Sequence, residues 1–90
     1  MSNAGLADAA SALDAIAAGV EPNRAELMSG ALALNYCIDS GVMNAKLQAA
    51  ALGLSVQASA PYDRRAYMSE AGRRYAGTLA EEVRKLMSTQ

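Results

Sequence analysis

The sequence predicts an all-α protein, a helical bundle of three helical segments that is completed by dimerisation. Apolar residues recur at three- and four-residue intervals along nearly the whole chain, and nowhere do they alternate with the period of a β-strand. The only prolines, Pro22 and Pro61, lie between the periodic stretches. They divide the chain into segments at about residues 5–18, 23–58 and 61–87.

The composition is that of one small globular domain, which we expect over residues 5–90. Ninety residues are too few for two cores, and 52% hydrophobic against 19% charged residues is too apolar for a disordered chain. Roughly a quarter of the residues are alanine, and Trp, Phe and His are absent. We interpret residues 1–4 as a disordered start or the remnant of a cleaved tag.

The first segment carries one narrow apolar stripe. Its members lie three or four residues apart: Leu6, Ala9, Leu13, Ile16 and Val20. Asp8 and Asp14 lie off the stripe, and Gly19 is a natural stop for a helix. Because much of the remaining surface is alanine, a neighbouring helix can approach this one closely.

The second segment begins at Asn23, which has the spacing of a capping box with Glu26. Between Glu26 and Asp63 only Asp39 and Lys46 are charged. A helix that is apolar on most sides is buried on most sides. We therefore expect the following residues to form an interface or core: Leu27, Ala31, Leu34, Ile38, Val42, Ala45 and Leu52.

The sequence Asp-Ser-Gly at residues 39–41 interrupts the second segment without shifting the phase of its apolar stripe. Two interpretations are open. One is a single helix of about 35 residues with a weak or kinked centre, since glycine costs about 1 kcal/mol there relative to alanine. The other is two helices that meet near Gly41. The unbroken phase favours the single helix.

The third segment, residues 61–87, is predicted to be an amphipathic outer helix. Pro61 suits the first turn of a helix, where its missing N–H costs nothing. Glu70 precedes Arg74 by four residues, and Glu81 precedes Lys85 by the same spacing, which is the favourable order for intrahelical ion pairs.

Few residues in this chain are suited to catalysis. Histidine, the commonest acid–base catalyst, is absent, and a single cysteine without histidine makes neither a thiol enzyme nor a zinc site. We interpret Cys37 as a small buried hydrophobe, and Asp39 as a residue at a helix break or in a polar contact between helices. No phosphate-binding glycine loop is present. We expect no enzyme activity, catalytic residue, cofactor or metal.

Charge and cysteine usage indicate a cytoplasmic protein that does not bind membranes. The chain has no run of eighteen apolar residues and no basic start typical of a signal peptide. One cysteine fits a reducing compartment. The net charge is −1, but residues 59–90 carry six bases and four acids, so the last third of the chain is mildly basic.

Residues 47–67 raise a DNA-binding alternative. The spacing of the first half of a helix-turn-helix is found at Ala49, Leu52, Gly53 and Leu54. The second half departs from this pattern, since Ser59 replaces a branched apolar residue and Pro61 would break the recognition helix. The alternative is therefore a small DNA-binding regulator with a degenerate motif and a basic third helix. Its phosphate contacts would come from Arg64, Arg65, Arg73 and Arg74.

The nearly charge-free stretch from residue 27 to residue 62 is the strongest functional signal. Three helices in a monomer of this size do not easily cover it, whereas a second copy or another protein would. We therefore expect a non-enzymatic homodimer that acts through protein–protein interaction, as an adaptor, chaperone or inhibitor. A self-interface and a groove for another protein require the same residues, so both remain open.

Overall fold

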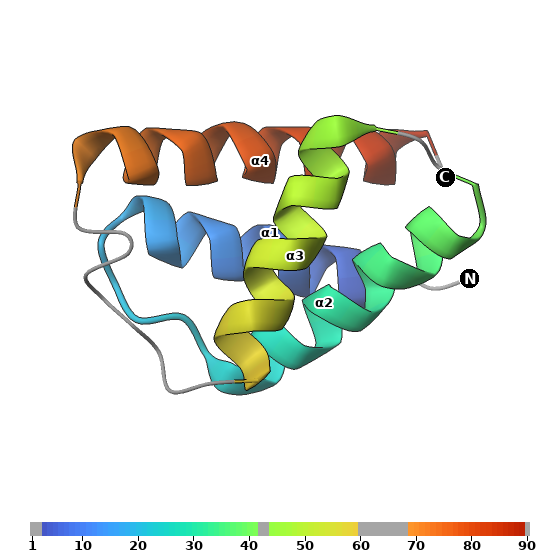
Figure 1. Ribbon diagram of the computed structural model, residues 1–90, viewed down its shortest axis with the longest axis horizontal. Helices are drawn as coiled ribbons and strands as arrows, with labels where there is room; N and C mark the ends of the chain where they lie inside the picture. The colour runs from blue at the N-terminus through green and yellow to red at the C-terminus, as the bar shows by residue number, and fades with distance from the viewer. Residues whose placement is uncertain (1–2, 42–43, 60–68, 90) are drawn as a thin grey trace.

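The computed structural model describes residues 3–41, 44–59 and 69–89, and over these ranges the chain is all-helical without strands. The four helices are α1 (Ala4–Ala17), α2 (Arg24–Asp39), α3 (Ala45–Ser59) and α4 (Glu70–Ser88). The helices α1 and α4 run antiparallel side by side, α2 packs on α1, and α3 crosses steeply in front of them (Figure 1). The predicted all-α class is confirmed.

The favoured single helix over residues 23–58 is wrong, because the chain forms two helices there, α2 and α3. The first of them ends at Asp39, and Gly41 follows with a φ of 103°, a conformation that residues with a side chain rarely adopt. Asp39 is exposed at this helix end, which agrees with its interpretation as a residue at a helix break.

A separate start signal lies immediately before α3. The Oδ1 atom of Asn44 accepts hydrogen bonds from the backbone N–H groups of Lys46, at 2.9 Å, and Leu47, at 3.2 Å. An asparagine in this position satisfies N–H groups that have no partner inside the helix. A glycine stop and an asparagine start therefore outweigh the unbroken phase of the apolar stripe.

The other helix ends follow their sequence signals, with one exception. The Oδ1 atom of Asn23 accepts from the backbone N–H of Glu26 at 3.1 Å, so the predicted N-cap is confirmed. Gly19 ends α1 with a φ of 75°. The exception is α4: Ser69 has an extended backbone and caps the helix that follows it, so the predicted start at Pro61 is wrong. Residues 61–68 lie outside the described residues.

The helices α1 and α2 cross where their backbones almost touch. A Cβ atom placed on Gly30 would lie 2.6 Å from the Cα atom of Ala9 and 2.8 Å from its N atom. A Cβ atom on Gly5 would lie 2.7 Å from the Cβ atom of Ala33. Because real Cβ atoms do not approach backbone this closely, position 30 accepts only glycine without movement of a helix.

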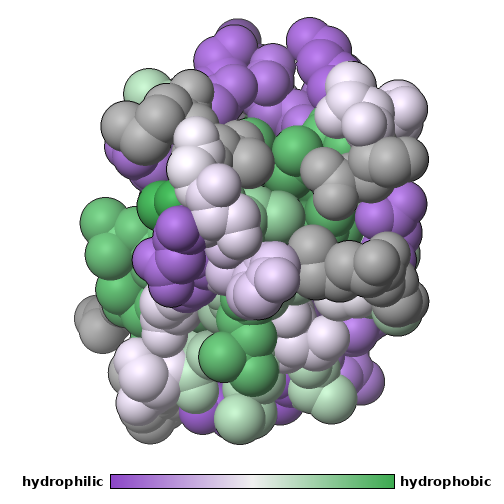
Figure 2. Space-filling model, turned by 90° about the vertical axis from the view of Figure 1, so that its right-hand side faces the viewer, coloured by the Kyte–Doolittle hydropathy of each residue, from purple (hydrophilic) through white to green (hydrophobic). Residues whose placement is uncertain are grey.

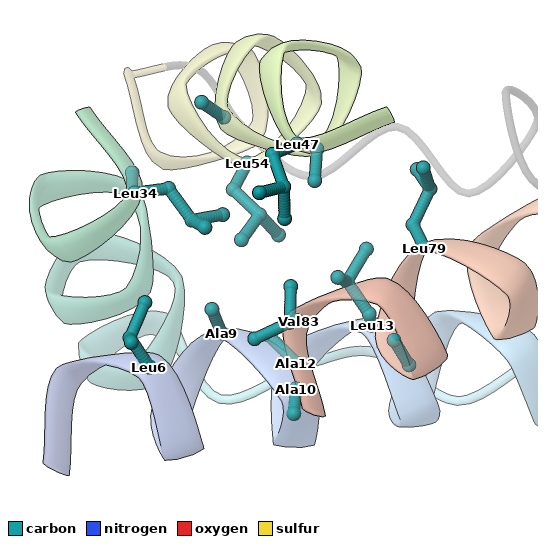
Figure 3. Packing of buried hydrophobic residues seen from close by; sticks show 14 of the residues in the cluster. Leu6, Ala9, Ala10, Ala12, Leu13, Leu34, Leu47, Leu54, Leu79 and Val83 are labelled. Atoms are coloured by element: carbon teal, nitrogen blue, oxygen red, sulfur yellow. The ribbon is translucent and has the colours of Figure 1, made fainter. Parts of the chain in front are cut away.

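The core consists mainly of leucine and alanine. Leu34, Leu47 and Leu54 point from α2 and α3 toward α1 and α4, while Leu13 and Val83 point back toward them (Figure 3). These residues are all buried. The core therefore closes within one copy of the chain, over residues of all four helices.

We expect Gly30→Ala to lower the free energy of unfolding by about 1–3 kcal/mol or more, because overpacking forces packed elements apart. Gly77→Ala in α4 is the matched control, since its new Cβ atom would meet Ala17 Cβ at an ordinary 3.9 Å. That variant should be neutral or gain up to about 1 kcal/mol from helix propensity. Urea unfolding followed by circular dichroism measures both, and equal losses would contradict the close crossing.

Candidate interaction surface

The seven residues predicted to form an interface or core lie in different environments. Three are buried inside the single copy: Leu27, Ala31 and Leu34. Ile38 is half-buried against this core. Ala45 and Leu52 are exposed on α3, Leu52 by 68%. Val42 lies outside the described residues. The α2 members of the set therefore belong mainly to the core, whereas the two described α3 members lie on the surface.

A group of large apolar side chains covers the outward side of α2 and α3. We call this surface the α2–α3 face, and its large members, 52–72% exposed, are Met28, Leu32, Tyr36, Leu52 and Val56. On each helix they lie four residues apart, on the side away from the core. Figure 2 shows hydrophobic groups standing out on the side where α3 lies, and hydrophilic groups gathered where α4 lies.

A shallow groove of about 290 Å³ lies between the two helices of this face. Its lining consists of Met28, Ala31, Leu32, Asn35, Ser55, Ala58 and Ser59. None of these side chains is charged. Among the residues that the structure describes, one hydrogen bond between side chains crosses the groove: the Nδ2 atom of Asn35 donates to the Oγ atom of Ser55 at 3.2 Å.

The cation nearest this face in sequence is used to hold α3 in place. The guanidinium of Arg24, at the start of α2, donates to the carbonyl oxygens of Gln57 at 3.3 Å and Ala58 at 2.7 Å. These carbonyls belong to the last turn of α3, where a positive charge is favourable. The role of Arg24 was missed from the sequence, since the contact joins residues more than thirty positions apart.

The exposure of Met28, Leu32 and Tyr36 was also missed. They are spaced four residues apart, offset by one position from the buried Leu27 and Ala31. This offset is visible in the sequence, but it does not say which of two adjacent apolar stripes faces the core.

The helix-turn-helix alternative requires a turn at Gly53, and the described structure has none there. The helix α3 continues from Ala45 to Ser59, so all four residues of the predicted half-motif lie in one helix. Leu47 and Leu54 are buried on the same side of it, and this packing exceeds the cost of about 1 kcal/mol for an internal glycine. The rest of the predicted segment, from residue 60 onward, lies outside the described residues.

The predicted phosphate-binding arginines are brought together only in part. Arg73 and Arg74 lie on α4, while Arg64 and Arg65 lie outside the described residues. The two α4 arginines share a shallow pocket with two acids, Glu70 and Glu81. The predicted pair of Arg74 with Glu70 is confirmed, with 3.7 Å between its charged atoms.

A bidentate ion pair joins α4 to α1. The guanidinium of Arg84 donates from Nη1 and Nη2 to the two carboxylate oxygens of Asp14. This hydrogen bonding raises the pKa of Arg84 above its ordinary value. The pair lies on the edge of the helix bundle, so its charges stabilise the α1–α4 seam without entering the α2–α3 face.

A second charged cluster joins the start of α3 to α4. The carboxylate of Glu82 lies 3.3 Å from the Nζ atom of Lys85 and 3.8 Å from that of Lys46. The hydrogen bond from Lys85 lowers the pKa of Glu82, and Lys46 adds to this effect. The predicted pairing of Lys85 with Glu81 is therefore wrong, because the ammonium turns to the residue three positions back.

Other kinds of site find little support within the described ranges. No three histidine, cysteine, aspartate or glutamate side chains there come together as metal ligands, and no helix there has the length and hydropathy to cross a membrane. Cys37 is buried in the core, as interpreted. Neither a family model, nor a curated protein, nor a solved structure matches this chain. Function therefore has to be inferred from the surface itself.

The charge of Glu82 predicts a pH dependence of stability. Because the pKa of Glu82 is lowered in the folded chain from its ordinary 4.5, its ionised form stabilises the fold above that pH. This contribution is lost as the pH falls through the lowered folded value. Wild type should therefore melt at a higher temperature than Glu82→Gln near neutral pH, and the gap should close in acid.

Thermal unfolding followed by circular dichroism over a series of pH values measures this gap. Glu81→Gln is the matched control, since the neighbouring carboxylate does not pair with Lys85. The difference in melting temperature between wild type and this variant should be smaller. A Glu82→Gln difference that stays constant from neutral pH down to about pH 2 would contradict the assigned role, because the stabilisation by the Glu82 charge has to be lost in acid.

Proposed function

We propose that this protein is non-enzymatic and acts through protein–protein interaction, with the α2–α3 face as its binding surface and a second copy of the chain as its first partner. The observation that supports this is the face itself, where five large apolar side chains are each more than half exposed around an uncharged groove. Burying one such side chain fully stabilises by about 1.5–3 kcal/mol. Association gains a part of this for each of them.

The chemistry of the face favours a second copy over a charged partner. The residues that line the groove include no acid and no base, so an oppositely charged surface would gain nothing there. A second uncharged apolar face is complementary to it. In a twofold dimer the same face meets itself, which is the commonest arrangement among oligomers.

The shape of the face also favours a second copy. Leu32 lines the groove of about 290 Å³ and is 72% exposed, so the Leu32 side chain of one copy can enter the groove of the other. The helices have 16 and 15 residues. Side by side they offer roughly 23 by 20 Å, or about 460 Å² on each copy, which suits a weak dimer that forms at high concentration.

An adaptor, chaperone or inhibitor would use the same face for a different protein. Its partner would carry an amphipathic helix, whose apolar stripe would lie in the groove in place of the second copy. The two versions of the proposal differ in the mass of the purified protein in solution.

A DNA-binding regulator is the alternative function. The observation in its favour is that Arg73 and Arg74 lie together on α4, in the basic third of the chain. The acids Glu70 and Glu81 in the same pocket weaken it. This alternative predicts binding to random duplex DNA that falls steeply with salt. Titration of a labelled duplex at low salt tests it, and the absence of binding there would remove it.

We expect the wild-type protein to have twice its chain mass of 9.3 kDa at high concentration. The double variant with Leu32→Gln and Leu52→Gln should shift the equilibrium toward the monomer. Each leucine should change the dissociation constant by about tenfold or more, because 1.4 kcal/mol corresponds to a factor of ten. Sedimentation equilibrium over a range of concentrations measures this, with circular dichroism to confirm that the double variant is folded.

Val20→Gln is the matched control, since Val20 is 57% exposed but follows α1 and is not part of the α2–α3 face. It should leave the dissociation constant unchanged. A wild-type chain that stays monomeric at every concentration would show that a second copy is not the partner, and the foreign-protein version would then be the one to pursue.

A further inference from the structure

We infer that Asn35 and Ser55 determine the register of self-association, by hydrogen bonding between the two copies across the twofold axis. This inference rests on the proposed function, because it concerns the α2–α3 face in a dimer. It assigns a specificity role to the side-chain hydrogen bond that crosses the uncharged groove within the described part of the chain.

Within one copy, Asn35 and Ser55 use some of their hydrogen-bonding groups and leave one acceptor and one donor available. The Nδ2 atom of Asn35 donates to the carbonyl oxygen of Ala31 at 2.8 Å and to the Oγ atom of Ser55 at 3.2 Å. The amide has two N–H groups, and these two contacts use both. The asparagine can still accept at Oδ1, and the serine hydroxyl can still donate its hydrogen. The pair thus presents one acceptor and one donor.

A dimer that covers the groove removes water from both groups. A buried donor or acceptor without a partner costs about 1–3 kcal/mol, so registers that place apolar side chains over this pair are disfavoured. A twofold axis beside the pair brings Asn35 and Ser55 of one copy next to Ser55 and Asn35 of the other. The Ser55 hydroxyl of each copy donates to the Asn35 Oδ1 atom of the other, and every group is satisfied.

A single polar residue in an apolar helix interface is known to select register and oligomeric state at some cost in stability. Most of the other side chains of the α2–α3 face are aliphatic. Leu32, Leu52 and Val56 can pack against apolar neighbours in several registers with similar energy. The polar pair is therefore what distinguishes one arrangement from the others.

Ser59 provides a matched control in the same groove. Its Oγ atom donates to the carbonyl oxygen of Ser55 at 2.9 Å within its own helix, so its hydrogen is already used. Removing that hydroxyl changes the groove by the same single atom as Ser55→Ala, without affecting the proposed contact between copies.

The experiment compares the assembly of wild type, Asn35→Leu, Ser55→Ala and Ser59→Ala by sedimentation velocity and equilibrium. Wild type and Ser59→Ala should each form one discrete dimer with similar dissociation constants. Ser55→Ala leaves Asn35 Oδ1 unpaired in the interface and should weaken the dimer about tenfold. Asn35→Leu removes the amide from the groove, so it should associate at least as tightly but into a distribution that includes species larger than a dimer.

The outcomes separate this inference from the proposed function. Discrete dimers with unchanged dissociation constants in both Asn35→Leu and Ser55→Ala would overturn the inference and leave the α2–α3 face as the interface. A wild-type chain that is monomeric throughout would overturn self-association and this inference together. If Asn35→Leu lost its helical circular dichroism, the test would be the dissociation constants of Ser55→Ala and Ser59→Ala. Equal dissociation constants for these two variants would overturn the inference.

Discussion

The rest of the structure depends on the contact between the backbones of α1 and α2 at Gly30 and Ala9. Because a Cβ atom at position 30 would lie 2.6 Å from backbone, the two helices can cross this closely only while residue 30 has no side chain. This crossing turns the stripe with Leu27 and Leu34 toward α1 and into the core. It thereby leaves the adjacent stripe of α2, with Met28 and Leu32, facing outward. The apolar face is thus a consequence of which side of α2 the small residues occupy.

Because the chain breaks between α2 and α3, α3 can form the second half of the α2–α3 face. With Gly41 and Asn44 reversing the chain, α3 folds back beside α2 and contributes Leu52 and Val56 to the same surface. The ion pairs that join helices lie elsewhere: Asp14 with Arg84 joins α1 to α4, and Glu82 with Lys46 joins α4 to the start of α3. The bundle is therefore held at its edges by charge, while one broad face between two helices remains apolar.

The sequence alone predicts the helical class, the cap at Asn23 and the stop at Gly19, because periodicity and capping are local properties. It does not predict the break near Gly41, since the phase of an apolar stripe carries no information about a glycine in a left-handed conformation followed by an asparagine cap. It does not separate core from surface on α2, because Leu27 and Leu32 are equally apolar and only the position of α1 decides between them. The roles of Arg24 and Asn35 depend on contacts 20 or more residues away.

The central claim, that the α2–α3 face binds a second copy of the chain, is tested most directly by methyl chemical shifts measured by NMR as the protein is diluted. The account predicts concentration-dependent shifts for Met28, Leu32, Leu52 and Val56, with the methyl groups of the α1–α4 side unchanged. Shifts confined to α1 and α4, or no change at any residue over the whole concentration range, would contradict it.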